Sequence, residues 1–131
     1  MSFKAELNIG GKLPYTVLES HYSLNQPIDD VHKPIGRPRG GLITLTVESF
    51  SDTELFHWMQ APNQTKDGTL TFFKSDAASI QKKLEFTNAY CVKYDEHFVA
   101  KGEKPMTITI TISAQTLKLG DVPFQNLWGL T

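Results

Sequence analysis

The chain has 131 residues, the length of one ordinary domain, so we expect a single domain over residues 1–131. Hydrophobic residues make up 40% and charged residues 21%, which is a globular composition and excludes a chain that is disordered throughout. Thirteen Lys and Arg residues oppose fourteen Asp and Glu residues, for a net charge of −1. This balance argues against a nucleic-acid binder and against adsorption to a membrane through a basic surface.

Cysteine content and the first residues indicate the compartment. The single cysteine, Cys91, excludes a scaffold stapled by internal disulfides and favours folding under reducing conditions. Residues Met1–Leu7 lack the apolar run of a cleaved signal peptide. No stretch approaches the roughly 20 apolar residues of a membrane helix. We expect a soluble protein made in the cytosol, without membrane insertion, that leaves the cell only by a route other than a cleaved signal.

Alternation of apolar and polar residues, with frequent Thr, Val, Ile and aromatic residues, predicts a mainly β protein. The predicted strands are, in chain order, Phe3–Ile9, Leu18–Leu24, Ile43–Glu48, Gly68–Lys74, Lys82–Thr87, Ala89–Val99 and Met106–Ala114.

The segment Pro27–Gly41 interrupts this pattern, with three prolines, three glycines and no usable period. Structureless loops of this length are uncommon in compact domains and usually functional. The basic stretch 36–41 is compatible with phosphate binding, although a solvated loop or a protein contact is the better interpretation. We predict that the segment lies in a contact between subunits or rings, through its charged residues Asp29, Asp30, Lys33, Arg37 and Arg39.

One helix is predicted after the third strand. Ser51 and Glu54 have the spacing of a capping box, and Phe50 and Leu55 that of a hydrophobic staple. Pro62 prevents much continuation, so we expect eight to ten helical residues. The helix should pack on the sheet and stabilise the subunit, rather than bind a ligand, through the apolar face Leu55, Trp58 and Met59.

The later strands carry two further signals. In the last one, the apolar parity flips at Gln115–Thr116, and a bulge or bend there would let one long strand serve two parts of a closed sheet. In Ala89–Val99, strict alternation predicts an apolar face of Tyr90, Val92, Tyr94 and Phe98 opposite Cys91, Lys93, Asp95 and His97. The tail from Asp121 has no regular pattern but bears large apolar groups, so it should dock on something rather than stay free: Phe124, Leu127 and Trp128.

No catalytic, cofactor or metal-binding constellation is recognisable. Cys91 and His97 are six strand residues apart, roughly 20 Å, too far for a hydrogen bond. The four histidines lack metal-ligand spacing, and no glycine-rich phosphate cradle occurs. We therefore predict a protein that is not an enzyme. Long two-sided strands suit a subunit whose edges are covered by neighbours, but alternation alone does not distinguish it from a ligand-binding barrel.

Six segments, taken together and in this order, are similar to the tube protein of type VI secretion systems, the haemolysin-coregulated protein (Hcp, TssD) family, in its Bacteroidetes-type branch. They are Gly40–Ser49, Glu54–Met59, Lys66–Leu70, Leu84–Tyr94, Pro105–Ala114 and Leu119–Asp121.

This resemblance implies a small antiparallel β-barrel of two packed sheets with one short helix at its side. It also implies hexameric rings that stack into a tube and are expelled with effectors by a contractile sheath. Implied partners are other copies of the chain, a spike protein, the sheath and effectors; no cofactor is implied. The tube would assemble in the cytoplasm and be secreted through the type VI machinery without a signal peptide. The alternatives are a monomeric small-molecule carrier built on a β-barrel and a phage-type tail-tube protein.

Overall fold

The computed structural model describes residues 4–10, 14–48, 53–74 and 79–128. The elements are β1 (Lys4–Ile9), β2 (Tyr15–Tyr22), β3 (Leu42–Glu48), α1 (Glu54–Gln60), β4 (Lys66–Phe73), β5 (Ile80–Phe98), β6 (Met106–Leu119) and β7 (Val122–Gln125).

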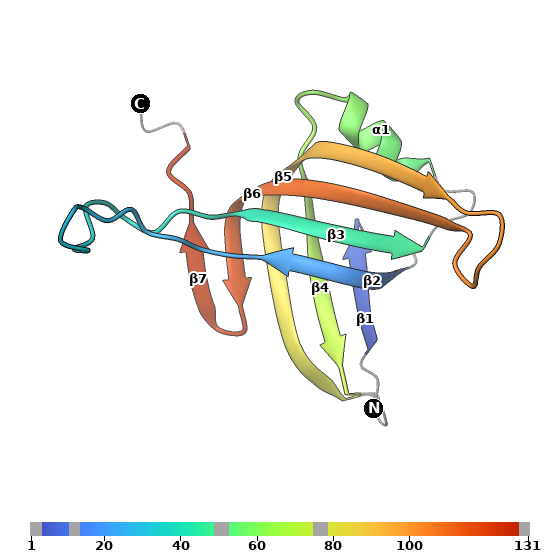
Figure 1. Ribbon diagram of the computed structural model, residues 1–131, viewed down its shortest axis with the longest axis horizontal. Helices are drawn as coiled ribbons and strands as arrows, with labels where there is room; N and C mark the ends of the chain where they lie inside the picture. The colour runs from blue at the N-terminus through green and yellow to red at the C-terminus, as the bar shows by residue number, and fades with distance from the viewer. Residues whose placement is uncertain (1–3, 11–13, 49–52, 75–78, 129–131) are drawn as a thin grey trace.

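The strands form one antiparallel sheet in the order β3-β2-β1-β4-β5-β6-β7, closed by a second pairing between β3 and β6. Six strands therefore make a closed barrel, and β7 is an extra strand on β6. The barrel consists of two layers whose strands cross (Figure 1). One contains β1, β4, β7, the beginning of β5 and the end of β6, and the other contains β2, β3 and the remaining halves of β5 and β6. The expected mainly β barrel with one short helix is confirmed.

Strands β5 and β6 bend together as they pass from one layer to the other. Where two strands were expected, β5 is a single strand of 19 residues that bends at Asn88, whose φ is 53°. The Asn88 side chain donates to the Gln115 side chain at 3.0 Å. At this level β6 exchanges partners, from β3 along Thr107–Ser113 to β7 along Thr116–Leu119. The prediction that one strand serves two parts of the sheet is confirmed.

The barrel interior is filled by aliphatic and aromatic side chains from both layers. Among the described residues, seventeen hydrophobic residues are buried and no buried side-chain polar atom lacks a hydrogen-bond partner. Eight of the larger aliphatic side chains have no exposed surface: Leu7, Ile43, Leu45, Val47, Leu70, Ile108, Ile110 and Ile112. Burial of such side chains is the main favourable contribution to folding.

Helix α1 packs against β5 and closes part of the core (Figure 1). It begins at Glu54, where the Thr53 carbonyl accepts the first helical hydrogen bond from the His57 N–H at 2.9 Å. Glu54 is thus the first residue of the helix, whereas the predicted capping box placed the helix start directly after Ser51, so that prediction is wrong about the start. Phe50 and Ser51 themselves lie outside the described residues. The helix has seven residues, fewer than expected, because it starts at Glu54 rather than directly after Ser51; it ends at Gln60, before Pro62 as expected.

The three residues of the predicted helix face lie toward the barrel. Leu55 and Trp58 are 2% and 1% exposed, and Met59 packs against the core at partial burial. The Trp58 indole N–H donates to the Gln64 carbonyl at 3.1 Å, which ties the helix to the segment that leads into β4. Phe56, at the border of this packed face, is 57% exposed and meets Tyr94 edge to face at 5.4 Å between ring centroids.

Trp58→Ala should lower the free energy of unfolding by about 3–5 kcal/mol, because it leaves a cavity at a fully buried aromatic site. Phe56→Ala is the matched control at a partly exposed aromatic residue of the same helix and should cost far less, because only the contact with Tyr94 is lost. Thermal unfolding followed by circular dichroism measures both. Equal effects of the two variants would contradict a supporting role for the Trp58 face.

Candidate assembly surfaces

Residues 23–41 form a long hairpin-like arm that extends β2 and β3 away from the barrel (Figure 1). At its base, Asn25 and Arg39 exchange two backbone hydrogen bonds of 2.8 and 2.6 Å. Further out, the Ile35 N–H donates to the Pro27 carbonyl at 2.9 Å. The segment predicted as an irregular loop is therefore an arm with its own backbone pairing. Its proline content hid this from periodicity because proline provides no N–H for a regular ladder.

The five charged residues predicted for this segment are distributed along the exposed arm. At the tip, the Asp29 carboxylate accepts hydrogen bonds from the Val31 and Lys33 N–H groups at 3.0 and 2.9 Å, so it shapes the turn. Near the base, the Arg37 guanidinium donates to the Gln125 carbonyl at 3.2 Å and ties the arm to β7. Asp30 and Arg39 are exposed. The tip also exposes large apolar side chains: Ile28, Val31 and Ile35.

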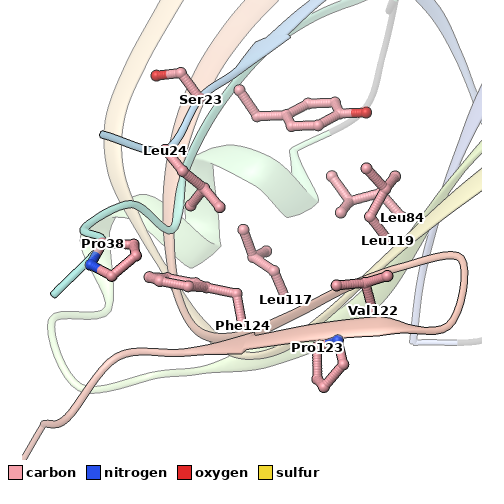
Figure 2. Close-up of a pocket in the computed structure, with 10 residues that line it drawn as sticks. Ser23, Leu24, Pro38, Leu84, Leu117, Leu119, Val122, Pro123 and Phe124 are labelled. Carbon is pink, nitrogen blue, oxygen red and sulfur yellow. The ribbon is translucent and has the colours of Figure 1, made fainter. Parts of the chain in front are cut away.

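An apolar groove of about 640 Å³ lies between the base of the arm, the first part of β5, the last part of β6, and β7 (Figure 2). Burial in its wall raises the pKa of the Tyr22 hydroxyl above its usual value. Sequence patterns missed the groove because residues distant in the chain form it: Tyr22, Ser23, Leu24, Pro38, Leu84, Leu117, Leu119, Val122, Pro123 and Phe124.

The C-terminal segment docks on its own barrel, and its part Val122–Gln125 is strand β7 on β6, so the expectation of an irregular tail is wrong there. The Asn126 side-chain amide donates to the Gly40 and Ala114 carbonyls at 3.0 and 2.9 Å, so it bridges the arm base and β6. Trp128 packs on Tyr90 with ring centroids 5.6 Å apart. Phe124 packs against the core at partial burial.

Two strands have edges that no other described strand covers. The last residue of β5 to pair with β4 is Ala89, so β5 has no strand on that side from Tyr90 onward. Likewise, β1 pairs with β2 only as far as Val17, which leaves the same side of β2 uncovered as far as Tyr22. Both edges belong to the layer β2-β3-β6-β5, one at each side of it. Exposed backbone edges of this kind are sites for pairing with another chain.

A bulge at Val92 decides which way the β5 side chains face. Cys91 pairs with Ile112 but Lys93 pairs with Thr111, so the register shifts by one residue between them. As a consequence, Tyr94 faces the core side, as Cys91 does, whereas Tyr90 faces the other side. The continuous apolar face predicted for this strand is therefore wrong. Val92 and Phe98 are 47% and 63% exposed.

The face of this layer that points away from the core is polar. It presents alternate residues of β3 and β6, whose hydroxyl groups meet across the strands. Thr46 and Thr109 are 2.9 Å apart between their oxygens, and Thr44 and Thr111 are 3.2 Å apart. Toward the edges this polar face continues into Glu19 and His21 on β2 and Lys93, Asp95 and His97 on β5.

Cys91 lies in the core at 7% exposure, and burial raises the pKa of its thiol to about 11. Such a thiol is a poor nucleophile at neutral pH because little of it is thiolate. Within the described part of the chain, no group of three or more His, Cys, Asp or Glu residues is placed to hold a metal ion. A search of the same residues for helices able to cross a membrane found none.

Comparison with known proteins identifies the family. The model of the family described as hemolysin coregulated protein Hcp (TssD) matches residues 1–129. The chain therefore belongs to the Hcp (TssD) family. In this family, rings that stack into a tube for type VI secretion are the general role, and the chain is a type VI secretion tube subunit.

Solved structures agree with this membership. Hcp1 from Flavobacterium johnsoniae is 41% identical, with a TM-score of 0.88 over 94% of this chain and 99% of that one. Hcp1 from Salmonella typhimurium has a TM-score of 0.75 at 16% identity, over 91% of this chain and 86% of that one. A chain of the sheath–tube complex of an extracellular contractile injection system has a similar fold, with a TM-score of 0.56 at 20% identity, over 88% of this chain and 86% of that one. The search of curated proteins gave no match.

The Cys91 thiol should react with a thiol reagent such as DTNB slower by a factor of about 100 or more in the native protein than after unfolding, at pH 8, because burial both raises its pKa from 9.0 to about 11 and shields it from the reagent. Stopped-flow absorbance in buffer and in denaturant measures the ratio. We further expect Cys91→Ser to leave assembly and secretion intact. Loss of secretion by an assembled Cys91→Ser variant would contradict a purely structural cysteine.

Proposed function

We propose that this type VI tube subunit closes into hexameric rings by joining the uncovered edge of β2 in one copy to the uncovered edge of β5 in the next. The observation that carries the proposal is the placement of the two edges at opposite sides of one four-stranded layer. A ring requires a heterologous interface, in which one surface binds a different surface of the next copy. These edges are such a pair.

Strand directions fit this closure. Neighbours in the layer β2-β3-β6-β5 are all antiparallel, so β2 and β5 run in opposite directions. A second copy that adds its β2 beside β5 by simple rotation therefore continues the antiparallel alternation. Antiparallel pairing across the contact satisfies the N–H and C=O groups of both edges.

In the ring that this closure generates, the polar face of the layer lines the bore, because the opposite face is packed on the core. The paired threonine hydroxyls leave a wall that is hydrophilic but carries charge only toward the strand edges. Such a wall suits the passage of folded, water-covered cargo without strong adhesion.

The arm makes contacts beyond its own subunit. It is exposed along most of its length, and its tip presents apolar side chains to solvent. Exposed apolar groups concentrated on one projection mark an interaction surface. We assign Asp30, Lys33 and Arg39 to contacts with other copies, and Asp29 and Arg37 to holding the arm in shape.

The remaining family properties complete the proposal. The chain acts as one domain over residues 1–131, catalyses no reaction and requires no cofactor. Its partners are its own copies, a spike protein, a contractile sheath and effectors. The tube assembles in the cytoplasm and is expelled through the type VI machinery. A phage-type tail-tube protein would share the assembly, whereas a small-molecule carrier would be monomeric.

Ring formation by the purified chain tests the proposal. Size-exclusion chromatography with light scattering should give the mass of a hexamer, and negative-stain images should show rings with an open bore. A monodisperse monomer at tens of micromolar protein, without rings, would overturn it and favour the carrier.

Shortening the arm provides a separate prediction. Replacing residues 26–38 by Asn-Gly keeps the Asn25–Arg39 backbone pair and offers it a two-residue hairpin turn. The variant should fold with an unchanged circular dichroism spectrum but lose rings or stacking. Full-length tubes from the shortened chain would contradict a contact role for the arm.

A further inference from the structure

The charges on the two uncovered edges specify how the subunits join, and this inference rests on the proposed ring. On the polar face, the β2 edge carries Glu19 and His21. The β5 edge carries Lys93, Asp95 and His97 on the same face. Glu19 and Lys93 are exposed, and neither has a charged partner among the described residues of its own chain. We propose that Lys93 of one copy forms an ion pair with Glu19 of the next copy in the ring.

The alternation of faces selects this register. On β5, the Val92 bulge turns Lys93 to the polar side, the same side as Tyr90, while Cys91 between them faces the core. On β2, the polar side holds Glu19 and His21, and Ser20 between them faces the core. Directly opposed residues of an antiparallel pair point to the same face of the sheet. Setting Glu19 opposite Lys93 satisfies this rule along the contact, with Ser20 opposite Cys91 and His21 opposite Tyr90.

Other registers that preserve the faces are less favourable. A shift of two residues places Glu19 opposite Asp95 and His21 opposite Lys93, which sets two carboxylates against each other and offers Lys93 no anion. Like charges directly opposed across strands are destabilising. A shift of four places Glu19 opposite His97 and His21 opposite Asp95, but it leaves Lys93 without an opposed residue because β2 ends at Tyr22.

The pair also explains how an exposed edge avoids wrong partners. Charged residues on an edge strand oppose indiscriminate pairing with other strands. Lys93 directly opposite Lys93 of a second copy is repelled, whereas Glu19 opposite Lys93 is attracted, so these charges favour a β5–β2 contact over a β5–β5 contact in that register. Electrostatic complementarity of this kind contributes specificity more than raw affinity.

Charge reversal and its compensation test the inference in the full chain. Lys93→Glu should weaken each contact about fivefold, because an attractive cross-strand pair becomes a repulsive one. Since a closed ring needs every contact, the fraction of protein in rings should fall by more than this. The double variant Lys93→Glu/Glu19→Lys reverses both partners and should restore rings. Lys101→Glu, at an exposed lysine of the β5–β6 hairpin, is the control for net charge and should leave rings unchanged.

Sedimentation velocity gives the ring fraction, and circular dichroism confirms that each variant is folded. Loss of rings in Lys93→Glu with recovery in the double variant supports the pair. Rings that persist in Lys93→Glu, or a folded double variant without rings, overturn the pair while the tube function stands. Absence of rings in the unmodified chain overturns the proposed function and the pair together.

Discussion

The ribbon formed by β5 and β6 is the feature on which the rest of the structure depends. The two strands pair from Leu84–Leu119 to Phe98–Met106, through both layers of the barrel. At Asn88 the ribbon bends without losing register, since Thr87 still opposes Thr116 and Ala89 opposes Ala114. The Asn88 N–H donates to the Asp67 carboxylate at 2.8 Å and its side chain donates to Gln115, so the bend is fixed from both sides. Because of it, one hairpin contributes core residues to two crossing layers.

The same bend creates the uncovered edges. Strand β4 follows the first half of β5 and separates from it at Ala89, where the ribbon turns into the other layer. The second half of β5 therefore has no strand on that side among the described residues, although its core face is still partly covered by α1. In an isolated chain such an edge is an aggregation hazard. In a ring it is the element that makes the bore wall continuous, so folding of the subunit and assembly of the tube share one structural cause.

Much of the fold was predictable because its signals are local. Regular alternation in Met106–Ala114 gave β6, and the parity flip near Gln115 correctly indicated that this strand changes partners. Leu55, Trp58 and Pro62 predicted the short helix, but not its start at Glu54. The spacing of Ser51 and Glu54 favoured Ser51 as the N-cap, whereas Thr53 is the N-cap although its side chain makes no cap hydrogen bond. The charged arm was recognised as unusual, whereas its backbone pairing was not, since no periodicity accompanies it.

The assembly surfaces were less predictable because they depend on contacts between distant segments. Alternation assigned Tyr94 and Phe98 to one face with Tyr90, and only the register against β6 reveals the bulge at Val92 that separates them. The groove likewise combines Leu24 of the arm with Leu84 and Phe124 from other strands. Which strand edges stay uncovered is a property of sheet order, which no residue pattern in the chain encodes.

An electron cryomicroscopy map of the assembled ring, at a resolution that traces strands, shows directly how the subunits join. We expect β2 of each subunit to lie beside β5 of its neighbour, antiparallel, in one continuous sheet. The hydroxyls of Thr46 and Thr109 should then line the bore. A map in which subunits meet through other surfaces, or in which this threonine face points outward, would contradict this expectation.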